Sequence, residues 1–273
     1  MQLHIGRPVP VPVRDDRGCA HCLAFSGGDP PTVDAPSPVV PLFNPARFRT
    51  RGENYHRAIE QFQTLGFHRV LTIEAVYPGQ SPPAVGERIV IEATENQRLW
   101  QKERLINLGL ETLRDDPPWG ACWPDADLEW STPIGPLIAH RLRTCHVLQP
   151  FERVHLLGPH GEIVHTARSH AAPRRASGSR DRSAGRHGAA LSRARRSGHA
   201  PPQVDLPRHC GFAWAARWST MQHGLFDASI LGSGDRYMLY AWLHRPWPES
   251  PAGLQSAWRA WWRLLVVSWQ RQA

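Results

Sequence analysis

The sequence predicts an α/β fold with a mixed, mainly parallel sheet flanked by helices. Short apolar runs typical of strands alternate along the chain with amphipathic helical patterns, as in proteins whose parallel strands are joined by helices. The chain has 273 residues, which is enough for one large α/β domain with its own core. An arginine-rich segment interrupts the alternation, so the predicted domain has a long first half and a short second half.

A strand and a helix open the pattern. The strand covers residues 38–43. The helix has one apolar face at helical spacing, formed by Tyr55, Ala58, Ile59, Phe62 and Leu65. Thr50 and Glu53 have the spacing of a capping box at its start, and Gly66 marks its end.

The other elements of the first half follow in the same alternation. A helix is expected at residues 99–113, and Pro133 stands at the first position of another. Strands are predicted at residues 70–77, 88–93, 145–151 and 153–157. A further short strand is predicted directly before the acid pair that begins at Asp125. This alternation favours parallel pairing, because a crossover helix returns the chain to the same end of the sheet.

The N-terminal region differs from the rest. Residues 1–36 are rich in Pro, Gly and Asp without periodicity, which predicts a disordered leader or a start assigned too far upstream. The region lacks the features of a secretory signal, and no apolar run reaches the roughly 18 residues of a membrane span. We therefore expect a cytoplasmic protein without a transmembrane segment. Cys19 and Cys22 have no second pair at zinc spacing, so we expect no zinc site.

The net charge of +8 is concentrated in one segment. Residues 167–200 contain nine Arg and one Asp, so the rest of the chain is neutral overall. Residues 167–206 have too few large aliphatic side chains to fold and are predicted to be disordered. We interpret them as an unselected insert or a frame-shifted stretch of a GC-rich gene. The alternative is an arginine-rich arm for nucleic acid or anionic lipid, and the neutral remainder argues against nucleic acid as a partner.

The second half resumes the pattern of the first. Residues 210–217 are strand-like, and a glycine-rich turn then leads into a helix that carries Met238, Leu239 and Trp242. The last segment is a short Trp-rich amphipathic helix. Such an apolar stripe packs onto its own domain more often than it lies on a membrane surface.

Asp125 and Asp127 are the first candidate site. With one residue between them at the end of a strand, the two carboxylates can share one hard cation. Oxygen ligands favour Mg²⁺ or Mn²⁺, which are usually completed by water and a substrate diphosphate. On their own, such acids are also common in turns.

Three further motifs surround this pair in the sequence. Phe48-Arg-Thr-Arg51 places Arg49 and Arg51 at a helix start, where two cations oppose the helix dipole unless an anion binds there; a solvated basic turn is the alternative. The helix at 99–113 carries Lys102 and Arg104, which can reach a phosphate. The last motif runs from Gly211-Phe-Ala-Trp214 to Gly232-Ser-Gly-Asp235, where glycines allow close backbone approach.

In this order, the four motifs resemble those of the β-1,4-galactosyltransferase-like group of GT-A glycosyltransferases. The resemblance covers about residues 38–150 and 208–245. It rests on Phe48–Arg51, on the acid pair, on the segment with Asp235, and on a helix motif matched by Trp100, Lys102, Arg104, Leu105, Ile106, Asn107 and Gly109. It implies a Rossmann-like GT-A domain and a transferase that moves a sugar from a nucleoside diphosphate, UDP foremost, to a hydroxyl of a saccharide or other acceptor.

The resemblance also implies residue roles. Asp125 and Asp127 would bind Mn²⁺ or Mg²⁺ at the donor diphosphate. Asp235 would be the general base that accepts the proton of the acceptor hydroxyl, with Asp227 in reserve. The nucleotide and its diphosphate would be held by Phe48, Arg49, Arg51, Lys102 and Arg104. Trp214 would stack on a sugar face, or else pack in the core.

On this basis the chain divides into four parts. They are a leader (1–36), a nucleotide-sugar-binding half (37–166), the arginine-rich segment (167–206) and an acceptor-side half with the Trp-rich helix (207–273). The sequence departs from the family at Pro124, which is expected to distort the ligand strand, and at its single acid in the last motif. His244 is a poor match for a late metal ligand. The alternatives to an enzyme are therefore an inactive glycosyltransferase-like remnant and a nucleic-acid-binding protein.

Overall fold

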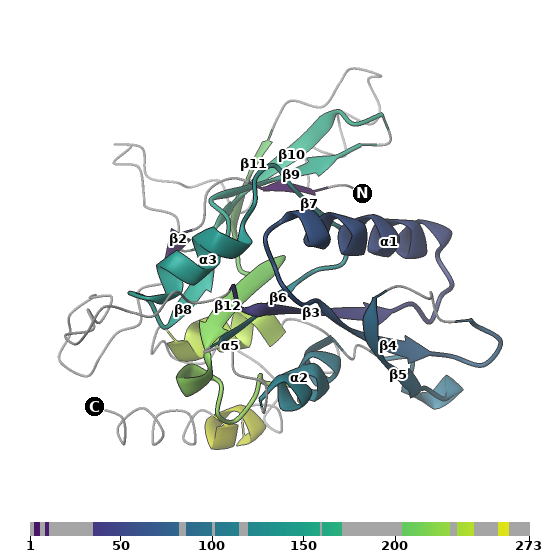
Figure 1. Ribbon diagram of the computed structural model, residues 1–273. Coiled ribbons are helices and arrows are strands. Elements are labelled where there is room, and N and C mark those ends of the chain that lie inside the picture. The colour runs from purple at the N-terminus through teal and green to yellow at the C-terminus, as the bar shows by residue number, and fades with distance from the viewer. Residues whose placement is uncertain are drawn as a thin grey trace.

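The computed structural model describes residues 3–5, 9–10, 35–81, 86–99, 102–114, 120–158, 160–170, 204–229, 234–242 and 256–261. These residues form an α/β fold around a seven-stranded sheet with the order β2-β8-β12-β6-β3-β4-β5. Figure 1 shows helices on both sides of this sheet. The predicted class, a mainly parallel sheet flanked by helices, is confirmed.

Four strands form the parallel part of the sheet. They are β3 (Ser37–Phe43), β4 (Leu71–Val76), β5 (Glu87–Glu92) and β6 (Gly120–Pro124), and their neighbouring pairs are all parallel. The antiparallel part is added by β12 (Ala213–Arg217), β8 (Val147–Gln149) and β2 (Val9–Pro10). The carboxyl ends of the parallel strands therefore share one edge of the sheet.

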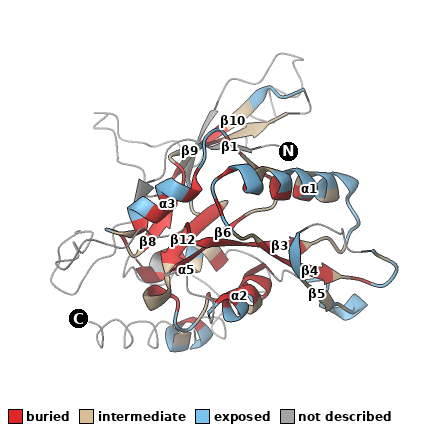
Figure 2. Ribbon diagram, viewed as in Figure 1, coloured by how far each residue is buried: buried red, intermediate tan, exposed pale blue. Residues whose placement is uncertain are grey.

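Two apolar cores cover the two faces of the sheet. The helices α1 (Arg49–Thr64) and α3 (Gly135–Leu142) pack on one face, and α2 (Lys102–Leu113) and α5 (Gly234–Trp242) pack on the other. Successive side chains of a strand point to opposite faces. In β6, accordingly, Trp123 belongs to the core under α2 and Cys122 to the core under α1. Figure 2 shows these central strands as buried.

A second sheet lies beside the first. Its order is β11 (Val204–His209), β10 (Ile163–Ser169), β9 (Arg153–Leu157), β1 (Leu3–Ile5) and β7 (Leu128–Trp130). The described elements also include two short 3₁₀ helices, Glu95–Gln97 and Trp218–Thr220, and a helix at residues 256–261 within the predicted C-terminal helix. No helix among the described residues is both long and apolar enough to cross a membrane.

The start of α1 differs from the prediction. The helix begins at Arg49, so Thr50 lies inside its first turn and caps nothing. The Asn44 side chain instead accepts a hydrogen bond from Phe48 N–H (3.0 Å) and donates one to Phe48 C=O (2.9 Å). The capping-box prediction was wrong because a residue outside the helix fixes the entering chain. The apolar face of α1 and the left-handed Gly66 (φ 79°) agree with the prediction.

The start of α3 is also shifted. The helix begins at Gly135, and Pro136 rather than Pro133 occupies its first turn. Gly135 N–H donates to Leu65 C=O at 2.9 Å, and a Cβ at Gly135 would collide with the backbone of Gly66. Close contact between the end of α1 and the start of α3 therefore sets this boundary.

Two predicted disordered regions contain strands. β1 and β2 lie within residues 1–36, β10 continues to Ser169, and β11 begins at Val204. The bounds of both regions are therefore corrected. β1 pairs with β7 and β9, β2 with β8, β10 with β9, and β11 with β10, which gives these strands backbone partners that local composition does not reveal. Residues 171–203, Cys19, Cys22 and His244 lie outside the described residues.

Candidate active site

The candidate site lies at the carboxyl end of β6. This strand ends at Pro124, and Asp125 follows it directly. Asp125 N–H donates to Phe212 C=O at 2.7 Å, and the β6–β12 register runs regularly through the Pro124–Ala213 pair. The expected distortion by Pro124 is therefore not found. Pro124 is the last residue of the strand and has no N–H group, and the backbone hydrogen bonding continues with the N–H group of Asp125.

Lys102 joins two of the candidate acids. Its Nζ lies 2.7 Å from Asp125 Oδ1 and 3.0 Å from Asp235 Oδ2, and its side chain is buried at the start of α2. Burial alone would lower the pKa of Lys102. The carboxylates of Asp125, Asp235 and Glu103 outweigh this effect and raise that pKa. Lys102 is therefore a fixed cation between Asp125 and Asp235.

Asp235 has the environment of a poised base. It lies in the first turn of α5, where the helix dipole favours a carboxylate. Burial and the charge of Asp125 raise its pKa, against the opposing effect of Lys102. Its Oδ1 is buried without a hydrogen-bond partner in the described part of the chain. A Cβ at the neighbouring Gly234 would displace the Glu103 carboxylate.

Neighbouring cations offset the negative charge of Asp127 less than that of Asp125, which contacts Lys102 directly. Burial and the charge of Asp125 raise its pKa to about 6, while Arg51 and Lys102 oppose the rise. Arg51, from the first turn of α1, therefore influences Asp127 through its charge, whereas the sequence had predicted a nucleotide-binding role for it.

The charges around the acid pair favour an additional cation. Four negative charges stand against two positive ones: Asp125, Asp127, Asp235 and Glu103 against Lys102 and Arg51. Carboxylate oxygens are preferred ligands of Mg²⁺ and Mn²⁺. Within the described residues, no three His, Cys, Asp or Glu side chains form a metal site. Asp125 and Asp127 could therefore supply only part of the ligand set of such an ion, and Lys102 already contacts Asp125 Oδ1 at 2.7 Å.

His209 and Phe212 adjoin the acids and were missed by the sequence reasoning. His209 Nδ1 accepts a hydrogen bond from Gly211 N–H (2.9 Å), and its ring stacks on Phe212 with centroids 4.3 Å apart. Burial lowers the pKa of His209, and the charges of Asp235 and Asp125 only partly oppose this. Phe212 has φ 78°, a conformation that non-glycine residues adopt mainly where the surrounding structure imposes it.

Asp227 occupies a separate place from Asp235. Its Oδ2 lies 3.3 Å from Arg104 Nη1 and 3.3 Å from Asn107 Nδ2, both on α2. Asn107 also bonds the backbone of Leu225 in both directions. Arg104 is thus engaged with an acid on the loop before α5. Of the two candidate bases, only Asp235 shares its counter-ion with the acid pair.

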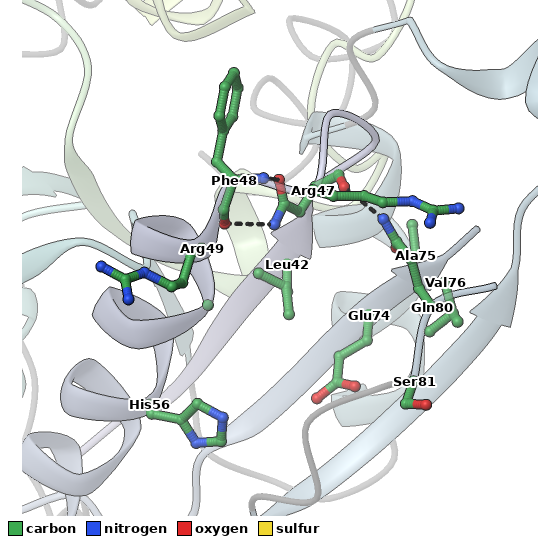
Figure 3. A pocket seen from close by; sticks show the side chains of 12 residues that line it. Leu42, Arg47, Phe48, Arg49, His56, Glu74, Ala75, Val76, Gln80 and Ser81 are labelled. Atoms are coloured by element: carbon green, nitrogen blue, oxygen red, sulfur yellow. Dashed lines mark hydrogen bonds between the residues drawn. The ribbon is translucent and has the colours of Figure 1, made fainter. Parts of the chain in front are cut away.

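Arg49 and Phe48 lie at a cavity of about 370 Å³ between the start of α1 and the ends of β3 and β4. Arg49 is 87% exposed and forms an ion pair with Glu53 at 3.4 Å. The Phe48 ring is 62% exposed and points away from the cavity in Figure 3. Of the first motif, Phe48 and Arg49 therefore lie at this cavity, whereas Arg51 influences Asp127 through its charge.

Trp214 lies in the core. It is fully buried on β12, its Nε1 donates to Cys210 C=O at 2.8 Å, and its ring lies 4.9 Å from that of Trp242. A ring without exposed surface offers no face to a sugar in this conformation. The structure thus favours the core position, which was the alternative for this residue.

The fold and site together define an α/β protein with a charged cluster at the carboxyl edge of its parallel strands, the usual place for a ligand in such sheets. Comparison with known proteins adds no family to this description. No family model matches the chain, and no curated protein matches it significantly.

Proposed function

We propose that the protein is a metal-dependent glycosyltransferase of the GT-A type, which moves a sugar from a nucleoside diphosphate, UDP foremost, to an acceptor hydroxyl. The observation that carries the proposal is the meeting of Lys102, Asp125 and Asp235 within 3.0 Å. These residues come from three separate sequence motifs, and their meeting at one place supports the proposal.

Asp235 is the proposed general base. Proton transfer requires a carboxylate that can reach the acceptor hydroxyl, and a raised pKa brings its basicity closer to working pH. In the transfer, the acceptor oxygen forms a bond to the anomeric carbon as the bond from that carbon to the diphosphate oxygen breaks. The hydroxyl proton passes to Asp235. Its Oδ1 accepts no hydrogen bond from the described residues.

We assign Lys102 and Arg51 to the part of the site that binds the donor diphosphate. Lys102 holds Asp125 and Asp235 in a fixed relation, so the metal ligand and the base stay aligned. The charge of Arg51 opposes the rise in the pKa of Asp127, and a guanidinium in this region would suit phosphate oxygens. A Mn²⁺ or Mg²⁺ ion held by Asp125 and Asp127 would offset the charge of the departing nucleoside diphosphate.

Binding of UDP tests the donor side. We expect calorimetric titration to show UDP binding that requires Mn²⁺ or Mg²⁺, and Asp125→Asn or Asp127→Asn to weaken it by roughly tenfold or more. Glu92→Gln removes an equal charge from the exposed end of β5 and should leave binding unchanged. Metal-independent binding, or equal loss in all three variants, would contradict the proposal.

Turnover tests the base. Asp235→Asn should lower kcat for transfer or for donor hydrolysis by roughly 10²–10⁴-fold with UDP binding retained, whereas Asp227→Asn should have a smaller effect. UDP binding without any turnover in the unaltered protein would instead support the inactive remnant. Salt-sensitive RNA or DNA binding that requires residues 171–203 would support the nucleic-acid alternative.

A further inference from the structure

We propose that His209 is a positioning residue of the candidate site. Its imidazole ring holds the turn at residues 210–212, and this turn fixes Asp125 and borders Asp235. The inference rests on the proposed function, because His209 would keep the proposed metal-binding acid and the proposed base of the transferase aligned with each other.

The turn at residues 210–212 connects the two sheets. β11 ends at His209 in the second sheet, and β12 begins at Ala213 in the main sheet. The His209 carbonyl oxygen accepts hydrogen bonds from Gln149 Nε2 and from His170 N–H, both at 3.2 Å. Since Gln149 is fully buried on β8, the backbone of His209 is fixed where the turn begins.

The His209 side chain holds the middle of the turn. Its Nδ1 accepts a hydrogen bond from Gly211 N–H at 2.9 Å, and its ring stacks on Phe212 with centroids 4.3 Å and planes 29° apart. Phe212 also meets Phe151 edge-on, with centroids 5.9 Å apart. Its φ of 78° is a conformation that a bulky residue keeps only where its surroundings impose it. His209 therefore contacts both residues that give the turn its shape.

The turn adjoins both acids. Phe212 C=O accepts a hydrogen bond from Asp125 N–H at 2.7 Å, which fixes the chain directly after β6. A Cβ added to Gly211 would lie 2.9 Å from His209 Cε1 and 3.5 Å from Asp235 Oδ2. The turn backbone is thus close to the imidazole ring and to the Asp235 carboxylate. If the ring releases Gly211, the strained turn can relax and Asp125 loses its backbone partner.

The contact requires one state of the imidazole. Nδ1 accepts the hydrogen bond from Gly211 only when His209 is neutral and carries its proton on Nε2. Burial and the charge of Lys102 lower the pKa of His209, while the charges of Asp235 and Asp125 oppose this. The neutral ring is therefore the form expected at about pH 7.5.

Two substitutions separate the two contacts of the ring. His209→Phe keeps an aromatic ring against Phe212 but removes the acceptor for Gly211 N–H. His209→Asn removes the ring but keeps an acceptor, because an asparagine side chain commonly bonds the N–H two residues further on. His155→Phe is the matched control, since it removes the hydrogen bond between His155 Nδ1 and Thr166 Oγ1 (2.9 Å) in the second sheet.

Hydrogen exchange of the Asp125 amide measures the turn without any turnover. We expect His209→Phe to speed this exchange by roughly tenfold, while the amides of β4 stay protected as before. His209→Asn and His155→Phe should leave the Asp125 amide close to its rate in the unaltered protein. The imidazole nitrogen chemical shifts of the unaltered protein should show the His209 proton on Nε2 at about pH 7.5.

Calorimetric titration of UDP with Mn²⁺ tests the link from the turn to the site. His209→Phe should weaken binding by roughly tenfold or more, as is usual for residues that orient a metal ligand, and His209→Asn should retain most of the affinity. If His209→Phe fails to fold, Gly211→Ala provides a second variant. Its added Cβ displaces the His209 ring, so it should also speed exchange at Asp125 and weaken UDP binding.

The overturning results are distinct. Unchanged UDP binding in His209→Phe, equal losses in His209→Phe and His209→Asn, or a proton on His209 Nδ1 would overturn the inference and leave the proposed function intact. If the unaltered protein binds no UDP in the presence of metal, the proposed function fails and this role of His209 fails with it.

Discussion

Two buried acids at the same edge of the sheet have different partners. Asp235 lies 3.0 Å from the ammonium group of Lys102. Glu74 has a neutral partner, the Tyr55 hydroxyl, and its closest recorded cation is 3.9 Å away. The first setting belongs to a charged cluster with excess negative charge, which suits a cation. The second is a nearly neutral setting, in which one carboxylate oxygen accepts a hydrogen bond from Tyr55 and the other faces Arg88 at 3.9 Å. Two acids of one protein thus differ in whether a charged or a neutral group is the closest partner.

The largest loss of stability is expected when the ion pairs around Asp235 are broken. Lys102→Met leaves Asp125 and Asp235 without their shared counter-ion, so we expect a loss of about 3–5 kcal/mol in the free energy of unfolding, measured by urea denaturation at neutral pH. Arg104→Met is the matched control on α2. Arg104 is 61% exposed in its pair with Asp227, and such a pair contributes at most about 1 kcal/mol. Equal losses in the two variants would remove the distinction.

A pH-dependent effect is expected at Asp127. Its pKa in the folded protein is about 6, above the usual 3.8. The folded state therefore binds the proton more tightly than the unfolded chain, and stability falls as pH rises through this window. Asp127→Asn removes the charge, so it should be more stable than the unaltered protein by roughly 2 kcal/mol at about pH 7.5.

That gain should shrink as pH falls and vanish at about pH 3, below the usual pKa of 3.8, where Asp127 is protonated in both states. Denaturation without divalent metal, at a series of pH values, measures it. A gain that does not depend on pH would show that side-chain shape, and not charge, is responsible.

A smaller effect is expected from the neutral setting. Tyr55→Phe removes the donor to Glu74 Oε1 and keeps the buried ring. Loss of one buried hydrogen bond should cost about 1–2 kcal/mol of unfolding free energy, measured as above. A cost as large as that of Lys102→Met would mean that Glu74 depends on Tyr55 as strongly as Asp235 depends on its ion pair.

Strand and helix periodicity predicted most of the main sheet, because its buried strands and amphipathic helices are encoded locally. The motifs also identified Lys102, Asp125 and Asp235, which the structure brings together. Glu74 escaped because one acid in a strand is normally assumed to face solvent. A strand covered by helices on both faces has no solvent-exposed side. The mainly apolar residues around Glu74 in this strand were the sequence feature that could have indicated its burial. The position of His209 depends on β11, whose pairing is not visible in local sequence.

The central place of β6 has a consequence for synthesis of the protein. One edge of β6 pairs with β3, which precedes it in the chain, but the other pairs with β12, which is made much later. Until β12 leaves the ribosome, the nascent sheet has a bare hydrogen-bonding edge on an apolar strand, a surface prone to association with other chains. Shortened products that end before Ala213 should therefore depend on chaperones and aggregate readily, even though they retain Lys102 and both acids of the pair.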